Sequence, residues 1–288
     1  PNPPLTESRP VSVATDPRNR FLFAANFTGQ TIDPFTINAS TGALTSVGNP
    51  AFVVGKPTHG VVDPSGRFLY VTTRDVVTAN DGWVTTWAIS QNDGSLAPLD
   101  THQVSDLALW DMCDPTGSFL YVASKTTVQG GAKISLLSIN PVNGSLTLSS
   151  NPPASAAGVT ALGYHPKKRS LYSVLTSANA IVTFTANPAS GELTVVAGGA
   201  GNSGLQPSAI SLTPDGRFAY VSYFETAGTG HVSEFSIDRA TGKLLVPAVQ
   251  YQDGLHPNDL AVDGSGRFLY VANSGSNTVS VFQVNAAT

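Results

Sequence analysis

Short stretches of alternating apolar and polar residues recur along the whole chain, and turn residues separate them. One unit has an apolar stretch at 58–62, Phe-Leu-Tyr-Val at 68–71 and an alternating Val-Thr-Thr-Trp-Ala-Ile at 84–89. A turn containing Gly94 and a further short stretch follow. Period-2 alternation of β-branched and aromatic residues between Gly and Pro turns is typical of strands. Each unit therefore predicts four antiparallel strands, and no segment has a convincing helical period.

The unit repeats six times. A nine-residue element, Asp-Pro-Ser-Gly-Arg-Phe-Leu-Tyr-Val at 63–71, recurs with variations at intervals of 47 to 51 residues. Its copies begin at Asp16, Asp63, Asp114, His165, Thr213 and Asp263. Repeats of this length are typical of solenoids and propellers, and four antiparallel strands per repeat describe a propeller blade. The sequence therefore predicts an all-β fold, a six-bladed β-propeller in which residues 1–288 form a single domain.

The two ends of the chain predict how the last blade is completed. Five units contain a Gly-Leu-Thr-type turn, whereas the sixth reaches 284–288 just before this turn should follow. The N-terminal Pro-Leu-Thr-Glu-Ser-Arg-Pro at 4–10 matches the segment at 43–48 of the first unit. We therefore expect the N-terminal strand, about residues 4–10, to pair beside 279–284 and to cover the edge of the last blade.

The repeat motifs resemble those of a known family. Phe-Leu-Tyr-Val-Ala-Asn-Ser-Gly-Ser-Asn-Thr-Val-Ser-Val-Phe at 268–282 is similar to YVTN-type and lactonase-type propellers. This family includes 6-phosphogluconolactonases of the propeller type and the fungal muconate-lactonising enzymes. The resemblance covers all six units and implies a hydrolase that acts on a small lactone or related ester at the mouth of the central channel. Family members usually have seven blades, so six repeats differ from the family pattern.

The resemblance also implies where the chemistry lies. The family's presumed catalytic groups belong to a Pro-Arg-His at the start of an inner strand and a Glu after a Tyr-Val strand. This chain has Pro-Thr-His at 57–59, which keeps the His, and Arg74 stands where an acid is implied. The alternative function is therefore a non-catalytic propeller that binds a sugar, peptide or protein partner. The loop aromatics Phe27, Trp83 and Phe224, expected to be exposed, favour this alternative.

Alignment on the repeated turn places one residue of every unit at a shared position in the innermost strand. These residues are Ser12, His59, Trp110, Ala161, Ala209 and Asp259. Functional groups of a propeller gather at one end of the channel, so His59, Trp110 and Asp259 should line one ring. The functional interpretation makes His59 a general base that activates water, and makes Asp259 an orienting or polarising group. The structural interpretation makes His59 a hydrogen-bonded channel residue and Asp259 a turn cap.

Longer loops after the second strand predict a binding surface for a small molecule at the channel mouth. These loops lie at 73–82, 124–131 and 223–230, and drift in loop length is the alternative explanation, since surface insertions cost little. Charged loop residues and neighbours of the ring make up the predicted substrate-binding set. The set consists of Arg74, Asp75, Trp110, Asp111, Lys125, Glu225 and Asn258.

Charge limits the classes of partner. Lys and Arg number 15 against 19 Asp and Glu, for a net charge of −4, which disfavours nucleic acid as a partner. Five arginines occupy the repeated turn, and the other ten basic residues are scattered along the sequence, which disfavours a phosphorylated sugar as substrate. No apolar run approaches the length of a membrane span. The sequence does not define the oligomeric state.

Cofactor and location are predicted from residue types. The five His and the single Cys113 form no zinc motif, so we expect no cofactor. Calcium held by Asn258, Asp259 and Asp111, as in six-bladed gluconolactonase-like propellers, is the alternative and would make the chain a calcium-dependent hydrolase. Residue 1 is Pro, and low Lys with abundant Ser, Thr and Asn favours a secreted or periplasmic protein.

Overall fold

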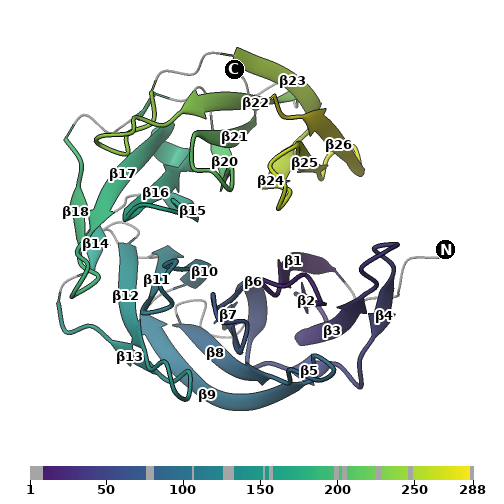
Figure 1. Cartoon of the computed structure of the whole chain (residues 1–288). Helices are drawn as coiled ribbons and strands as arrows, with labels where there is room; N and C mark the ends of the chain where they lie inside the picture. Colours follow the sequence, from purple (N-terminus) through teal and green to yellow (C-terminus); the bar gives the residue numbers. More distant parts are fainter. Residues whose placement is uncertain are drawn as a thin grey trace. The chain divides into compact units, whose positions relative to one another are not determined.

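The chain folds into antiparallel β-sheets that follow one another along the sequence. The computed structural model describes residues 9–75, 81–105, 107–125, 133–151, 153–155, 158–197, 201–202, 206–224, 229–245 and 249–285. It divides into two compact units, Pro1–Pro153 and Ala154–Thr288. Each unit carries three main sheets, so the fold is the predicted all-β, six-bladed propeller (Figure 1). The described residues include no helix with the length and apolar character needed to cross a membrane.

In the first unit, each sheet has the strand order of the chain. The orders are β1-β2-β3-β4, with β5 also on β3, then β6-β7-β8-β9 and β10-β11-β12-β13. The strands are β1 (Pro10–Thr15), β2 (Phe21–Asn26), β3 (Thr31–Ile37), β4 (Leu44–Ser46), β5 (Ala51–Phe52), β6 (Lys56–Val62), β7 (Phe68–Arg74), β8 (Asp81–Ile89), β9 (Leu96–Ser105), β10 (Leu107–Cys113), β11 (Phe119–Lys125), β12 (Lys133–Ile139) and β13 (Leu146–Leu148). The four-strand repeat predicted from the sequence is confirmed here.

The second unit repeats the same plan. Its orders are β15-β16-β17-β18, with β19 on β17, then β20-β21-β22-β23 and β24-β25-β26. The elements are β14 (Ala154–Ser155), β15 (Val159–Tyr164), β16 (Ser170–Leu175), a 3-10 turn (Thr176–Ala178), β17 (Ala180–Ala186), β18 (Leu193–Val195), β19 (Gly201–Asn202), β20 (Pro207–Leu212), β21 (Phe218–Phe224), β22 (Thr229–Ser236), β23 (Val249–Leu255), β24 (Pro257–Val262), β25 (Phe268–Asn273) and β26 (Thr278–Gln283). The last sheet has three described strands. Residues 1–8 lie outside the described part, so closure of this sheet by the N-terminal strand stays a prediction.

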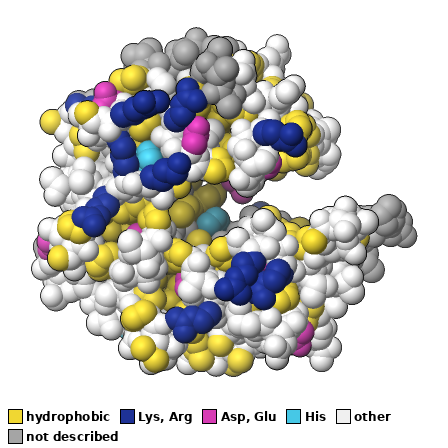
Figure 2. Space-filling view, in the orientation of Figure 1, with side chains coloured by type: hydrophobic (Ala, Val, Ile, Leu, Met, Phe, Trp, Pro, Cys, Tyr) yellow, Lys and Arg dark blue, Asp and Glu magenta, His cyan; other side chains and the backbone are white. Residues whose placement is uncertain are grey.

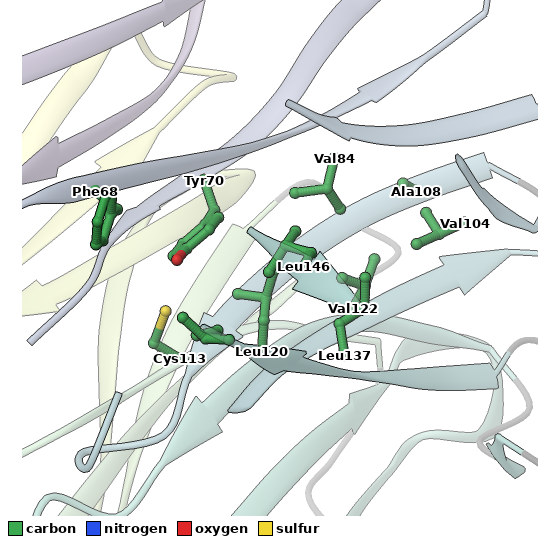
Figure 3. Packing of buried hydrophobic residues seen from close by; sticks show 11 residues of the cluster. Phe68, Tyr70, Val84, Val104, Ala108, Cys113, Leu120, Val122, Leu137 and Leu146 are labelled. Atoms are coloured by element: carbon green, nitrogen blue, oxygen red, sulfur yellow. The ribbon is translucent and has the colours of Figure 1, made fainter. Parts of the chain in front are cut away.

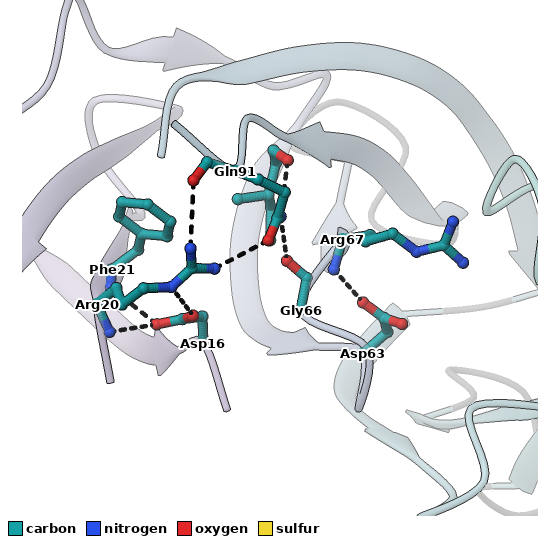
Figure 4. A network of polar contacts seen from close by, with 8 residues as sticks. Asp16, Arg20, Phe21, Asp63, Gly66, Arg67 and Gln91 are labelled. Atoms are coloured by element: carbon teal, nitrogen blue, oxygen red, sulfur yellow. Dashed lines mark hydrogen bonds and ion pairs between the residues drawn. The ribbon is translucent and has the colours of Figure 1, made fainter. Parts of the chain in front are cut away.

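The repeated Asp closes the turn between the first and second strands of a sheet. Oδ1 of Asp16 accepts hydrogen bonds from the backbone N–H groups of Arg20 and Phe21, at 2.5 and 2.8 Å. Asp63, in the next repeat, does the same with the backbone N–H groups of Arg67 and Phe68, at 2.8 Å each, and Figure 4 shows the contact with Arg67. A carboxylate that satisfies two turn amides explains why Asp recurs at this position.

The turn arginines join neighbouring sheets. Arg20 pairs with Asp16 at 3.1 Å and reaches the carbonyl and the side-chain oxygen of Gln91 in the next sheet, at 3.2 and 2.9 Å (Figure 4). Arg67 donates to the Pro141 carbonyl, again in the next sheet. Small groups of Lys and Arg also stand out on the face of the molecule in Figure 2. At Arg20 and Arg67, the repeated arginine is therefore a structural residue.

Aromatic side chains of one sheet pack on the glycine turn of the next. A Cβ added to Gly94 would lie 2.5 Å from the Phe21 ring, and one added to Gly144 would lie 2.5 Å from the Phe68 ring. The Tyr70 hydroxyl also donates to the Gly144 carbonyl at 3.2 Å. Below this contact, apolar residues of β7–β9 and β10–β13 fill the space between the two sheets (Figure 3).

The aromatic position of the Tyr-Val strand is buried in five sheets and exposed in the last. Tyr70 is 0% exposed, whereas Tyr270 at the equivalent position of β25 is 42% exposed. Val279 and Val281 of β26 are exposed as well. Leu260 and Val271, on the other face of the sheet, belong to a core shared with β20–β22. In the described part of this unit, only one face of the last sheet is therefore covered.

Substitution of Gly144 by Ala tests the packing between sheets, with Gly42 as the matched control. Both glycines close the same type of turn with positive φ, 74° and 70°, but a Cβ at Gly42 would meet no atom within 4 Å among the described residues of its own unit. We expect Gly42→Ala to lower the free energy of unfolding by about 1–2 kcal/mol, from backbone strain alone. Gly144→Ala should cost about 1–3 kcal/mol more, because the methyl group overlaps the Phe68 ring. Urea unfolding measures both, and equal losses would contradict the contact.

Candidate active site

A β-bulge recurs in the innermost strand of every sheet, immediately before the aligned position. In β6 the register with β7 shifts between Pro57 and His59, and in β10 the register with β11 shifts between Ala108 and Trp110. The other four innermost strands shift at the equivalent place. A bulge leaves one residue unpaired and changes the direction of the side chain that follows it. The bulge therefore helps to set the direction of the His59 and Trp110 side chains.

The bulged residue of β6 joins two sheets. Oγ1 of Thr58 lies 3.1 Å from the Thr72 carbonyl and 3.0 Å from the Ala108 carbonyl of the next sheet. In the second unit, Oγ of Ser208 makes the same bridge to the carbonyls of Ser222 and Pro257, at 3.2 and 2.7 Å. The small hydroxyl residue that replaces the family's Arg at 58 thus holds β6 against β10.

This bridge brings three predicted site residues together in the first unit. Nδ1 of His59 on β6 lies 2.6 Å from Oδ1 of Asp111 on β10. The ring of Trp110 stacks on the His59 ring, with centroids 3.9 Å apart and an interplanar angle of 19°. An aromatic face and a carboxylate together fix both the plane and the rotation of an imidazole. His59 is therefore held in one orientation from two sides.

Burial governs the electrostatics of the pair. Asp111 is 0% exposed, and its burial raises the pKa of the carboxyl above its usual value, while the hydrogen bond and charge of His59 act in the opposite direction. Burial also raises the pKa of the nearby Cys113 thiol well above its ordinary value, which keeps the thiol protonated and unreactive. Oδ2 of Asp111 and Nε1 of Trp110 are buried and have no hydrogen-bond partner among the described residues.

The pair has the geometry of a general base. With the Nδ1 proton directed at Asp111, the other ring nitrogen, Nε2, carries the lone pair. The His59 side chain is 12% exposed, and the described residues provide no hydrogen-bond partner for Nε2. An imidazole held in this way has a lone pair with which it can accept a proton, and a neighbouring carboxylate stabilises an imidazolium.

The remaining predicted site residues belong to other elements of the fold. Lys125 ends β11 and is exposed, and the backbone N–H of Asp75 bonds the Asp81 carbonyl at 2.9 Å. Asn258 and Asp259 are the second and third residues of β24 in the second unit, where Oδ1 of Asp259 accepts a hydrogen bond from the Leu260 N–H at 2.8 Å. A joint role of Asp259 with His59 stays a prediction.

Parts of the predicted binding loops cannot be placed. Glu225 lies outside the described residues, as do 76–80, 126–132 and 226–228 of the three long loops. In the part of the chain that is described, no three His, Cys, Asp or Glu side chains are arranged to hold a metal ion. Calcium binding by Asn258, Asp259 and Asp111 also stays a prediction.

Sequence analysis missed a cluster of positive charge beside the same strands. Arg9, Lys56 and Arg74 all approach the ring of Phe27, with 4.6, 5.0 and 4.7 Å to its centroid. Three basic residues that are scattered in the sequence are thus convergent in space, and Phe27, expected to be an exposed loop aromatic, is 9% exposed. The available signal was the basic residue directly before the Pro of the innermost strand in the first two repeats, at Arg9-Pro10 and at Lys56-Pro57.

The repeated blades define a β-propeller, and two neighbouring innermost strands, β6 and β10, carry an imidazole–carboxylate pair. The family model described as "Lactonase, 7-bladed beta-propeller" matches residues 27–124 and 162–288. The chain therefore belongs to the lactonase family of β-propellers. The sequence-based assignment to this family is confirmed.

Individual relatives agree with the family assignment. A 6-phosphogluconolactonase of Bacillus subtilis is 27% identical over 300 residues, which cover 97% of this chain and 81% of that protein. The 6-phosphogluconolactonase of Erwinia tasmaniensis is 27% identical over 280 residues, covering 95% and 80%. Among solved structures, the periplasmic gluconolactonase of Pseudomonas aeruginosa superposes with a TM-score of 0.76 at 21% identity, covering 96% of this chain and 81% of that one. This last similarity establishes a shared fold.

The pH dependence of stability tests the buried state of Asp111. The pKa of Asp111 is raised in the folded chain. At a pH between the usual Asp value and this raised value, the folded chain therefore holds a proton on Asp111 that the unfolded chain has released. Wild type should therefore gain stability relative to Asp111→Asn as the pH falls through this window, by up to about 1.4 kcal/mol per pH unit. Urea unfolding of both proteins between about pH 2 and 7 measures the difference, and this range includes the lowered pKa of the control described next.

Asp93→Asn provides a control of opposite sign. Hydrogen bonds from Ser90 and Ser95 lower the pKa of the exposed Asp93 carboxyl, so wild type should lose stability relative to this variant as the pH falls through the lowered value. If the difference in unfolding free energy between wild type and Asp111→Asn does not change with pH, the pKa of Asp111 is not raised in the folded chain.

Proposed function

We propose that the chain hydrolyses a small lactone or a related ester, with His59 as the general base. The observation that carries this proposal is the 2.6 Å contact between His59 Nδ1 and Asp111 Oδ1. Membership of the lactonase family and relatives named 6-phosphogluconolactonase support a lactone as the substrate.

The reaction follows from the orientation of the imidazole. Nε2 of His59 removes a proton from water while the water oxygen attacks the lactone carbonyl carbon, which forms a tetrahedral intermediate. The ring C–O bond then breaks, and the imidazolium returns its proton to the departing ring oxygen. The product is an open-chain hydroxy acid. Asp111 stabilises the imidazolium formed between the two steps, and Trp110 prevents the ring from rotating out of this position.

Substitution of His59 tests the proposal. His59→Gln keeps a polar side chain but removes the base, so we expect kcat for lactone hydrolysis to fall by about 10²- to 10⁴-fold. Asp111→Asn should lower kcat as well, because an amide does not stabilise the imidazolium. Initial rates measured by pH-stat titration of the acid product give both values. His102→Gln, on β9 of the same unit, is the matched control and should keep the wild-type rate.

The alternatives predict different results in the same assay. Rates that are equal in wild type and His59→Gln would remove His59 from the mechanism. Loss of activity with EDTA and recovery with calcium would favour the calcium-dependent hydrolase. A protein that binds sugars or peptides but turns over no lactone would favour the non-catalytic binding propeller.

A further inference from the structure

A cavity of about 310 Å³ lies in the second unit, where the turns that join the first and second strands of three sheets come together. These turns connect β15 with β16, β20 with β21, and β24 with β25. A volume of this size is at the lower end of the range for small-molecule sites. The lining residues that give the cavity its chemistry are Lys167, Pro214, Asp215, Phe218, Ser265 and Val284.

The cavity is separate from the aligned positions of the innermost strands in the same unit. Asp259 is the third residue of β24, whereas Ser265 follows the end of that strand at Val262. Three residues of extended strand between Asp259 and Val262 span roughly 10 Å. A ligand in this cavity is therefore distinct from one that meets the aligned positions of this unit.

The fifth repeat departs from the repeated turn at the wall of the cavity. In three other repeats the third turn position is Ser65, Thr116 or Ser265, whose hydroxyl donates to the repeated Asp at the first position. The fifth repeat exchanges the two groups, so that Oγ1 of Thr213 at the first position donates to Oδ1 of Asp215 at the third, at 2.6 Å. Thr213 is 3% exposed and Asp215 is exposed. The exchange therefore moves the carboxylate from the buried position of the turn to the cavity wall.

The fourth repeat places a cation at the same turn position. Lys167 stands where other repeats have Ser or Thr, and its backbone N–H donates to Nδ1 of His165 at 3.0 Å. The other ring nitrogen of His165 donates to the Gly216 carbonyl of the next turn, at 3.0 Å. The imidazole is thus used within the fold, and the exposed Lys167 side chain is the group that this turn offers to the cavity.

Lys167 and Asp215 line one cavity without forming an ion pair. The ion pairs found among the described residues include neither side chain. Burial raises the pKa of the Asp215 carboxyl, but hydrogen bonds from Thr213 and Arg217 and the charges of Arg217 and Lys167 outweigh it and hold this pKa below its usual value. At neutral pH the cavity therefore presents a carboxylate and an ammonium that do not neutralise each other by direct contact.

The remaining wall of the cavity is largely apolar. Phe218 and Val284 are 7% and 9% exposed, and Pro214 adds a further apolar surface. The Ser265 hydroxyl is occupied, because it donates to Asp263. The cavity thus combines one positive charge, one negative charge and an apolar wall.

We propose that this cavity binds a zwitterionic α-amino acid with an apolar side chain. The ligand carboxylate pairs with Lys167, the ligand ammonium pairs with Asp215, and the side chain packs on Phe218. Asp215 repels a simple anion and Lys167 repels a simple cation, whereas a zwitterion satisfies both. The volume corresponds to about ten water molecules in the liquid, which accommodates leucine. This binding does not depend on the hydrolysis of a lactone.

Isothermal titration with L-leucine tests the site. Lys167→Gln and Asp215→Asn each remove one charge, and the Asn side chain keeps an oxygen that can accept from Thr213. We expect Kd for L-leucine to rise at least about tenfold in each variant, because each loses a hydrogen bond between charged groups. Arg18→Gln is the matched control, since Arg18 is an exposed charged residue at the same turn position of the first repeat. Absence of binding to wild type, or an equal rise of Kd in Arg18→Gln, would overturn the proposal.

Two analogues of leucine assign each charge to its partner. Isocaproate lacks the ammonium and isoamylamine lacks the carboxylate, so both should bind wild type at least about tenfold more weakly than leucine does. Asp215→Asn should lose the preference for leucine over isocaproate, and Lys167→Gln should lose the preference for leucine over isoamylamine. Preferences that stay unchanged in these variants would contradict the two contacts.

Thermal unfolding gives an independent readout, because a ligand that binds only the folded chain stabilises it. Without ligand, both variants should keep a Tm close to that of wild type, since both side chains are at least partly exposed at a turn. One fixed concentration of L-leucine should raise Tm of wild type and Arg18→Gln equally, and should raise Tm of Lys167→Gln and Asp215→Asn less. An equal rise in all four proteins would show that leucine does not act through this cavity.

Discussion

The structure depends on the need of each sheet to bury its apolar faces against its neighbours. Strands with apolar residues on both faces are stable only when packed between layers, and within each unit the innermost strands of successive sheets lie against one another. Tyr70 at 0% exposure and Tyr270 at 42% show the difference between a covered face and an uncovered one. The Asp turns, the arginine bridges and the glycine turns all lie where one sheet meets the next.

The same packing creates the candidate active site. In the first unit, the side chain that follows the bulge in β1 and in β6 reaches the residue after the aligned position of the next sheet. The Gly60 N–H donates to Oγ of Ser12 at 3.2 Å in the same relation. His59 and Asp111 occupy this pair of positions one sheet further on, where the contact becomes an imidazole–carboxylate pair. The His59–Asp111 contact of the candidate site is thus equivalent in position to the contact between Ser12 and Gly60, which joins the two preceding sheets.

Sequence patterns predicted the fold well because the repeated residues each have a defined structural role. Asp16 and Asp63 close turns, and Gly144 fits against an aromatic ring, so each leaves a regular signal. His59 and Trp110 were also named from their register, and Asp111 was named as a neighbour of Trp110. The contact between His59 and Asp111 was not predicted, because alignment pairs His59 with Trp110 at the same position of the next repeat. In the structure, the side chain of His59 instead meets the residue that follows this position, Asp111.

The basic cluster could not be predicted for a different reason. Arg9, Lys56 and Arg74 belong to three separate segments, and only the pairing of β6 with β7 and the bond between Arg9 and Phe27 bring them together. Both the cluster and the buried Asp111 place charge where the fold alone would favour neutral residues. Such arrangements persist when the surrounding structure holds them in place, as the repeated turns and bridges do here. Charge concentrated at a cost to stability is typical of a site that meets a charged or reacting ligand. In this chain β6 contributes to both instances, through Lys56 to the cluster around Phe27 and through His59 to the pair with Asp111.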